Sequence, residues 1–381
     1  MLDFSKAFDK VPHHRLFLKL SHYGIQGQTL NWIKAFLTNR TQSVILEGAN
    51  SKAAHVKSGV PQGTVLGPIL FLLFINDLPE QVSSTVRLFA DDCALYREIN
   101  NAKDANMLQN DLDALQQWEN TLLMSFNPGK CAVLSFCPTR NSINTNYIIH
   151  SETLKRCKSC KYLGVTISDD FKWSSHISSI TKKANKQLGF VRRNTRKLPQ
   201  SFREAAYKSL VRPHLEYCSS VWDPHINLDD QKLERIQRQA ARYVTGDYKR
   251  TSSVTEMLQI LQWPSLSTRR TVNRLTMVYK ILNGLVAIPS EKFFSYNNTR
   301  TRRTHNMILQ TYLPRGNIDK FAFAQRAVPE WNKLPGSVAH ADTPDKFQDQ
   351  LFKLQHIMYA SIHSNLTKMP LIVHTDLVSS S

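Results

Sequence analysis

The spacing of apolar residues alternates between a helical and a strand period along the chain. Apolar residues recur every three or four positions over 13–20, 29–37 and 105–124, which predicts helices with one buried face. An unbroken apolar run over 71–75 follows a loop rich in glycine and proline and indicates a buried helix. From residue 173 onward helical spacing dominates, and it predicts helices over 173–199, 201–215 and 228–244. The pattern therefore predicts an α+β protein whose second half is mostly α-helical.

Short runs of strand-forming residues separate these helices. Two of them meet at Asp91 and Asp92, which predicts a β-hairpin with the carboxylates at its bend. We also expect a hairpin around Gly48 and, after the tight turn 127–130, a strand over 131–136. Residues 161–167 read as one strand broken by Gly164, for which core packing is an equally good explanation.

The acidic bend is an unusual hairpin turn. Such turns favour Asn-Gly or Asp-Gly because positive φ is needed, and adjacent carboxylates repel each other. A divalent cation would offset that repulsion, since hard ions take carboxylate oxygens. The alternative is an ordinary solvated turn. The bend is thus a candidate metal site, and other segments must decide between the two interpretations.

Two further segments carry candidate chemistry. In the loop 58–70, Gln62 lies among glycines and prolines ahead of the apolar helix, where backbone amides and the helix dipole favour an anionic or polar ligand. The alternative is an ordinary turn before a buried helix. Lys130 ends the turn 127–130 and is directed at a strand edge, although a lone lysine is usually a solvated charge.

Composition and charge narrow the class of partner. The chain has 381 residues, 41% of them hydrophobic, and a net charge of +19. Residues 1–150 hold 13 Lys and Arg against 12 Asp and Glu, so +18 of the excess lies in the remainder. Such asymmetry favours a surface that holds a polyanion, most often nucleic acid, over an anionic membrane. Seven cations follow one another in the helical stretch after Trp173 with no acid among them: Lys182, Lys183, Lys186, Arg192, Arg193, Arg196 and Lys197.

The sequence does not support a membrane-spanning, secreted, disulfide-rich or zinc-binding protein. The longest apolar run, 65–75, is too short to cross a bilayer, and the N-terminus lacks a signal-peptide pattern. Six cysteines are too few for a disulfide scaffold, and the Cys157–Cys160 pair has no second pair of zinc ligands. We therefore expect an intracellular protein of the nucleus or cytoplasm, neither secreted nor bound to a membrane.

Five motifs, in order, resemble the reverse transcriptases of non-LTR retrotransposons, LINE-type elements of the jockey-like kind. They are Leu2-Asp3-Phe4-Ser5-Lys6-Ala7-Phe8-Asp9, Gly59-Val60-Pro61-Gln62-Gly63, Phe89-Ala90-Asp91-Asp92, Asn127-Pro128-Gly129-Lys130 and Tyr162-Leu163-Gly164. Residues 320–335 also look like the C-terminal region of such elements. The resemblance implies a right-hand polymerase palm, an antiparallel sheet with helices on one face, followed by a mostly α-helical thumb and C-terminal region.

The resemblance also implies roles for individual residues. Asp3 would fold back beside Asp91 and Asp92 to hold two Mg²⁺ ions, with Mn²⁺ as an alternative, and Lys130 would approach the phosphates of the incoming nucleotide. Phe8 would be a steric wall against a ribose 2′-hydroxyl, which favours DNA synthesis over an RNA polymerase or a maturase-like activity. The substrate-binding residues would be Phe4, Phe8, Pro61, Gln62, Gly63, Phe89 and Ala90, and the primer grip Tyr162, Leu163 and Gly164.

The implied partners are an RNA template, a DNA primer and deoxyribonucleoside triphosphates, with the seven cations on the thumb. We expect the palm and partial fingers over 1–168, the basic thumb over 169–250, and a C-terminal region over 251–381 with a linker near 293–304. Fingers strands and an endonuclease would precede Asp3, so we expect an N-terminally truncated chain. The competing hypothesis is an inactive relic that binds nucleic acid through its basic half.

Overall fold

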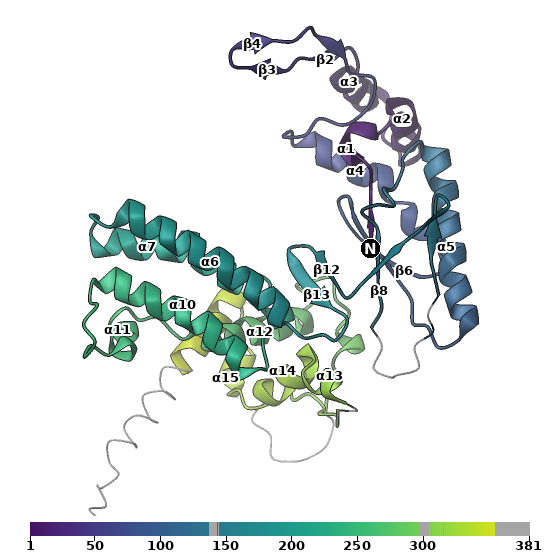
Figure 1. Cartoon of the computed structure of the whole chain (residues 1–381). Coiled ribbons are helices and arrows are strands. Elements are labelled where there is room, and N and C mark those ends of the chain that lie inside the picture. Colours follow the sequence, from purple (N-terminus) through teal and green to yellow (C-terminus); the bar gives the residue numbers. More distant parts are fainter. Residues whose placement is uncertain (137–142, 144, 298–304, 306, 315, 355–381) are drawn as a thin grey trace, which may run out of the picture. The chain divides into compact units, whose positions relative to one another are not determined.

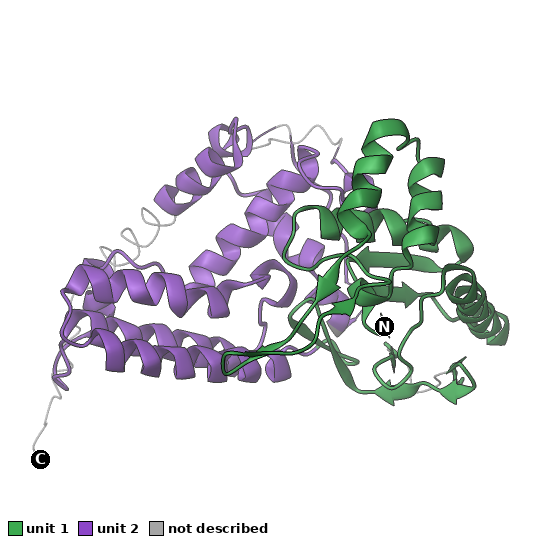
Figure 2. Cartoon of the chain, turned by 90° about the horizontal axis from the view of Figure 1, so that it is seen from above, with its two compact units in different colours: residues 1–171 green, residues 172–381 purple. Residues whose placement is uncertain are grey.

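The computed structural model describes residues 1–136, 143, 145–297, 305, 307–314 and 316–354. The chain divides into two compact units, residues 1–171 and 172–381 (Figure 2). The expected thumb, apart from residues 169–171, and the expected C-terminal region share the second unit. Most of the linker expected near 293–304 lies outside the described residues.

Unit 1 surrounds one hydrophobic core with helices at the positions that the apolar spacing predicted. The long helix α5 opens with a capping box between Asn101 and Asp104, and it buries Leu112, Leu115 and Trp118. The helices of this unit are α1 (Ala7–Lys10), α2 (His13–His22), α3 (Gly27–Leu37), α4 (Leu66–Ile75), the 3₁₀ turn η1 (Leu78–Gln81) and α5 (Ala102–Leu122) (Figure 1).

The central sheet of unit 1 is small and antiparallel. Its strands are β1 (Leu2–Asp3), β6 (Thr85–Phe89) and β7 (Asp92–Tyr96), in the order β1-β7-β6. The predicted acidic hairpin is therefore confirmed as β6–β7. Aromatic side chains pack beneath it: Phe4 stacks on Phe126 with ring centroids 4.4 Å apart.

The remaining strands form two-stranded pairs. They are β2 (Thr41–Gln42) with β5 (Ala54–His55), β3 (Ile45–Leu46) with β4 (Ala49–Asn50), β8 (Ala132–Leu134) with β11 (Lys155–Cys157), β9 (Ile148–Ile149) with β10 (Glu152–Thr153), and β12 (Ser159–Tyr162) with β13 (Val165–Ser168). Only β8–β11 is parallel among these described pairs. The hairpin expected around Gly48 is confirmed and splits into two short ladders. The single strand expected over 161–167 is wrong, because Leu163 and Gly164 both have positive φ and reverse the chain.

Unit 2 is helical in its described residues. Its helices are α6 (Ser174–Thr195), α7 (Gln200–Leu210), α8 (Arg212–Glu216), α9 (Ser219–Trp222), α10 (Asn227–Thr245), α11 (Val254–Ile260), α12 (Leu266–Leu282), η2 (Ser290–Lys292), α13 (Asn317–Lys320), α14 (Phe323–Trp331) and α15 (Gly336–Ala339). The helix expected over 201–215 is broken at Val211, because Pro213 has no N–H to continue the α7 ladder.

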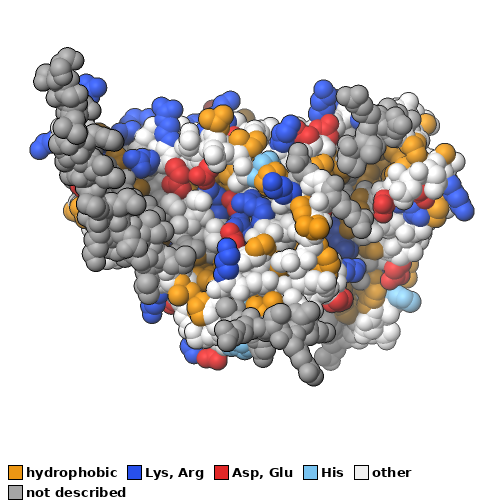
Figure 3. Space-filling view, turned by 90° about the horizontal axis from the view of Figure 1, so that it is seen from below, with side chains coloured by type: hydrophobic (Ala, Val, Ile, Leu, Met, Phe, Trp, Pro, Cys, Tyr) orange, Lys and Arg blue, Asp and Glu red, His pale blue; other side chains and the backbone are white. Residues whose placement is uncertain are grey.

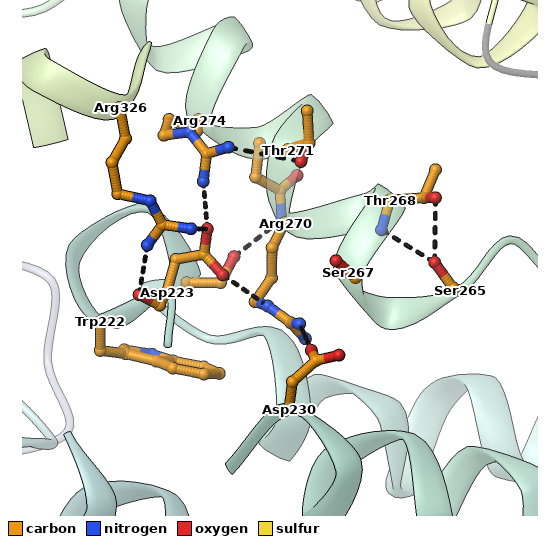
Figure 4. Close-up of polar contacts among 12 residues, drawn as sticks. Trp222, Asp223, Asp230, Ser265, Ser267, Thr268, Arg270, Thr271, Arg274 and Arg326 are labelled. Atoms are coloured by element: carbon orange, nitrogen blue, oxygen red, sulfur yellow. Dashed lines mark hydrogen bonds and ion pairs between the residues drawn. The ribbon is translucent and has the colours of Figure 1, made fainter. Parts of the chain in front are cut away.

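A buried ion-pair network joins the helices of unit 2 (Figure 4). Asp223 accepts from Arg270 Nε at 2.7 Å and from Arg326 Nη2 at 2.8 Å, and it also pairs with Arg274. Arg274 in turn binds both oxygens of Glu330. Because Arg326 and Glu330 belong to α14, the network explains why residues after 250 pack in the same unit as the basic helices.

Candidate active site

The acidic bend is a two-residue turn between β6 and β7. Phe89 pairs with Asp92, so Ala90 and Asp91 form the loop. Ala90 has φ of +50°, whereas Asp91 is not among the residues with positive φ. Only the first loop position therefore has positive φ, and an alanine occupies it where glycine is usual.

Strand β1 brings the third carboxylate to this bend. Asp3 lies directly opposite Asp92 in the antiparallel β1–β7 pair. Residues opposite each other on one face of such a pair have Cβ atoms about 5 Å apart. Burial and the neighbouring Asp91 and Asp3 carboxylates raise the pKa of Asp92. The fold therefore concentrates negative charge at one end of the small sheet.

The other edge of β1 is occupied by the segment that leads to Lys130. Asn127 donates its backbone N–H to Asp3 O at 2.8 Å, and Phe4 forms a bridge with Phe126. The turn then closes with Lys130 N on Asn127 O at 2.9 Å. As a result Lys130 Nζ lies 3.3 Å from Asp3 Oδ1, with the lysine side chain 62% exposed.

The carboxylates suit a divalent cation in their chemistry, although they are not gathered into a complete cation site. Within the described residues, no three His, Cys, Asp or Glu side chains form a group that could hold a metal ion. Asp3 Oδ1 is nevertheless buried, and its partner in the described chain is the Lys130 ammonium 3.3 Å away. Carboxylate oxygens are the ligands that Mg²⁺ prefers. Asp3, Asp91 and Asp92 therefore fit the group by donor type.

The glycine-rich loop packs on the segment that carries Phe8. Val60 N donates to Phe8 O at 2.8 Å, and Gly59 N donates to Val11 O at 2.7 Å. Phe8 itself is half-buried and stacks on Phe71 of α4 with centroids 4.5 Å apart. Gln62 is exposed at the tip of this loop. The two motifs are thus joined through their backbones.

The remaining substrate-binding candidates differ in exposure. Gly63 and Phe89 are exposed, Phe89 by 63%, and Ala90 is half-buried in the turn. Pro61 is buried. Phe4 is only 2% exposed and packs between Phe126 and Trp118. Strand alternation turns Phe4 into the core when Asp3 faces outward, and its substrate-binding role stays a prediction.

The primer-grip candidates form the turn of the β12–β13 hairpin. Tyr162 pairs with Val165, and Leu163 and Gly164 are the two loop residues. Burial raises the pKa of the Tyr162 phenol, and the Asp92 carboxylate adds to that rise. The negative charge of the acidic bend therefore acts on the Tyr162 phenol.

The seven cations lie on α6 and just beyond its end. All except Arg192, which is half-buried, are exposed: Lys182, Lys183, Lys186, Arg193, Arg196 and Lys197. Within the described chain none of the seven lies in an ion pair with an acid. Lys and Arg side chains also spread across the face seen in Figure 3, with hydrophobic side chains among them. These charges remain available to a polyanion.

A buried pair that no sequence motif indicated supports the acidic bend. Glu119 of α5 is 2% exposed and accepts from the backbone N–H of Phe126, and His150 Nε2 lies 2.8 Å from its other oxygen. Burial raises the pKa of Glu119 despite these bonds. Because Phe126 precedes Asn127, this pair fixes the segment beside Asp3. An acid on the apolar face of a predicted helix was the available signal.

Comparison with known proteins agrees with the motifs. Residues 1–167 match the family described as reverse transcriptase (RNA-dependent DNA polymerase). The RNA-directed DNA polymerase from mobile element jockey of Drosophila melanogaster is 30% identical over 275 residues, which is 68% of this chain and 30% of that protein. The corresponding Drosophila funebris protein is 31% identical over 271 residues, 66% of this chain and 29% of that protein.

A probable RNA-directed DNA polymerase from transposon X-element of Drosophila melanogaster is 28% identical over 254 residues, 64% of this chain and 28% of that protein. The chain thus spans about 30% of the length of these relatives. In the described part of the chain, no helix combines the length and apolar character needed to cross a membrane. Residues 1–167 thus carry a reverse transcriptase domain, and the chain is similar to the RNA-directed DNA polymerases of LINE-type, non-LTR retrotransposons.

Proposed function

We propose that this chain carries RNA-directed DNA polymerase activity, extending a DNA primer on an RNA template with deoxyribonucleoside triphosphates. The observation that carries the proposal is the pairing of Asp3 with Asp92 beside Asp91, with Lys130 Nζ 3.3 Å from Asp3 Oδ1. Relatives named as RNA-directed DNA polymerases support the reaction type. Unit 1 would be the palm and α6 the start of the thumb.

Reverse transcriptases use divalent metal ions, and here Asp3, Asp91 and Asp92 would hold two Mg²⁺ ions, with Mn²⁺ as an alternative. When bound, such ions activate the primer hydroxyl and stabilise the leaving pyrophosphate. The chain's own residues supply the rest. Lys130 offers an exposed ammonium beside the acids, suited to hold a triphosphate oxygen and to give a proton to the leaving group.

The neighbouring motifs would orient the substrates. Phe8, stacked on Phe71, presents a rigid ring suited to exclude a ribose 2′-hydroxyl. Pro61, Gln62 and Gly63 would border the nucleotide and template pocket, with Phe89 and Ala90 on the opposite side. Tyr162, Leu163 and Gly164, which form the β12–β13 turn, would contact the primer end.

The seven cations of the α6 region would hold the phosphates of the template–primer duplex. Their lack of acidic partners within the described chain supports this role, because their charges are not already neutralised by the protein. Each cation that neutralises a phosphate releases counterions, so the binding should depend on salt. Lys182, Lys183 and Lys186 follow at helical spacing and lie on the exposed side of α6.

Primer extension on an RNA template with Mg²⁺ tests the proposal. We expect the wild type to extend a labelled DNA primer with deoxyribonucleotides, and Asp91→Asn/Asp92→Asn to lose extension while binding template–primer as before. Asp113→Asn is the matched control, because Asp113 is an exposed acid on α5 whose only described partners are Gln109 and Gln116.

The same experiment separates the competing hypothesis of an inactive nucleic-acid binder. The seven cations of the α6 region, which lie in no ion pair with an acid in the described chain, favour binding regardless of catalysis. If wild type and the double variant both fail to extend, and both bind template with equal salt dependence, the polymerase proposal is wrong for this chain and the binder remains.

A further inference from the structure

Helices α6 and α10 run side by side in the same direction and end together (Figure 1). Near their starts, Ser174 Oγ donates to Asp229 of α10. Near their ends, the Thr195 and Tyr243 hydroxyls share a hydrogen bond of 2.6 Å. The C-terminal ends of both helices therefore meet at one end of unit 2.

An exposed aromatic ring stands at this end. Tyr248 is 55% exposed and follows Gly246, whose φ of +75° ends α10. Arg192 Nη2 donates to the Tyr248 hydroxyl at 3.3 Å, and the guanidinium lies 5.8 Å from that ring and 5.9 Å from the buried Tyr243 ring. The arginine thus fixes the phenol in place while more than half of the Tyr248 surface stays open.

The loop that carries Tyr248 is held by a second arginine. Arg242 donates to Lys249 O at 3.1 Å and to Ser252 O at 3.3 Å. Asp247 Oδ1 also accepts from Lys249 N at 3.0 Å, closing a local turn. The ring is therefore displayed on an ordered loop, which lowers the entropy lost when a ligand stacks on it.

The positive charge at the end that carries Tyr248 exceeds the amount that would offset the negative ends of the two helix dipoles. Two helix C-termini together carry about one negative charge, and Asp247 adds another. Apart from Arg203 and Arg242, whose guanidinium groups bond to backbone carbonyls, six cations belong to this end and leave a surplus of about four: Arg192, Arg193, Arg196, Lys197, Lys249 and Arg250. Five of them are exposed and Arg192 is half-buried. Offsetting the helix dipoles does not account for a surplus of this size.

A second exposed ring lies at the same end. Phe202, 62% exposed, is in the first turn of α7, next to Arg203. Arg203 Nη1 donates to Tyr243 O at 2.9 Å, which brings the start of α7 to the end of α10. Exposed aromatic rings among unpaired cations are the combination found on surfaces that bind single-stranded nucleic acid.

We propose that this aromatic–basic end, formed by Tyr248, Phe202 and the six cations, binds an unpaired stretch of nucleic acid by stacking a base on Tyr248 and holding the flanking phosphates. A base inside a duplex offers no open face for the ring, so the surface selects unpaired over paired strands. The inference deepens the proposed function, because it rests on the nucleic-acid role of the α6 cations.

Binding of fluorescently labelled strands to the full chain tests the inference. The probes are oligo-U and oligo-dT of about 15 nucleotides and a duplex of equal length. We expect Tyr248→Ala to weaken binding of both single strands about five- to a hundredfold and to leave duplex binding unchanged. Tyr248→Phe keeps the ring and should bind within about twofold of wild type. Tyr248→Leu keeps apolar bulk without a π-face and should behave like alanine.

Two controls make the result specific. Tyr217→Ala removes a ring of similar exposure, 57%, and should leave binding of every probe unchanged. Lys182→Gln/Lys183→Gln/Lys186→Gln should weaken both single strands and duplex and reduce the salt dependence of binding. Thermal unfolding verifies that each variant is folded, and Tyr248→Leu stands in for alanine if the latter is not.

The outcomes distinguish the two proposals. Single-strand binding by folded Tyr248→Ala or Tyr248→Leu at wild-type strength, or an equal loss on duplex, overturns the stacking site. If the lysine variant still weakens binding while the Tyr248 variants do not, the nucleic-acid role of α6 is supported and only the stacking site at Tyr248 is wrong. If neither variant affects any probe, both are wrong.

Discussion

Replacing Gly59 by alanine tests how the glycine-rich loop is joined to the segment bearing Phe8. Gly59 has φ of +93°, and a Cβ there would lie 2.8 Å from Asp9 O and 2.9 Å from both Asp9 Cα and Phe8 O. All three contacts are with backbone, so no side-chain rotation relieves them. The loop or the Phe8–Asp9 segment must move, although Gly59 N is bonded to Val11 O and Val60 N to Phe8 O.

The expected cost follows from two separate effects. An alanine in a left-handed conformation costs about 1–2 kcal/mol, and forcing a methyl group into occupied space costs about 1–3 kcal/mol more. Gly63 provides the comparison, because its φ of +80° is similar but a Cβ there would meet nothing within 4 Å. Gly63→Ala therefore carries only the first cost. The gain from a stiffer unfolded chain is the same for both variants and cancels in the difference.

Thermal unfolding, with hydrogen exchange to localise the effect in residues 1–171, measures both variants. At about 2–4 °C for each kcal/mol, Gly59→Ala should lower Tm by roughly 4–20 °C and Gly63→Ala by roughly 2–8 °C. The loss of protection in Gly59→Ala should centre on residues 7–11 and the loop. Equal Tm values for the two variants would refute the close-contact argument and leave backbone conformation as the whole effect.

Three further predictions concern the site and its support. Phe8→Val or Phe8→Ala should increase ribonucleotide incorporation in primer extension, and an unchanged preference for deoxyribonucleotides would remove the steric-wall role. Burial and the neighbouring carboxylates raise the pKa of Asp92, so its contribution to stability falls as pH rises through the folded-state pKa. Asp92→Asn should therefore raise Tm at neutral pH in the presence of a chelator and give no gain at acid pH. The same variant should abolish primer extension. Asp223→Ala should cost about 3–5 kcal/mol in urea unfolding, because it removes the carboxylate that Arg270, Arg274 and Arg326 share in the buried network. Asp342→Asn, on an exposed pair with Lys346, should change nothing measurable.

Much of the secondary structure followed from apolar spacing because it is set by local periodicity. The positions of α2, α3, α5, α6 and α10 follow the expected stripes within a few residues. The acidic hairpin was equally accessible, since two apolar runs separated by polar residues indicate a reversal. Turns in which residues other than glycine adopt positive φ were not predictable from the residue types. Leu163 lies in the turn that replaced the expected strand, and His150 and Ser151 form a second turn of this kind.

The proximity of Asp3 to the bend could be expected only from resemblance, because no local pattern links residues 3 and 92. The supporting pair Glu119 and His150 is likewise a tertiary feature, formed when α5 packs against the β9–β10 turn. His150 N also donates to Gln116 of α5, which holds that left-handed turn in place. Distant contacts of this kind offset the strain of a left-handed backbone, and a single sequence does not reveal them.

The short β1 strand illustrates how these distant contacts determine the site. Two residues of strand have little intrinsic stability, yet β1 is bonded along both edges. On one side Leu2 and Asp3 pair with Cys93 and Asp92, and on the other Asn127 N and Ala132 N donate to Asp3 O and Met1 O. An interior strand keeps its register even when short, because a slip of one residue would exchange the buried Leu2 and the outward Asp3. The apolar residues beside Asp3 therefore hold its carboxylate opposite Asp92 against the repulsion between them.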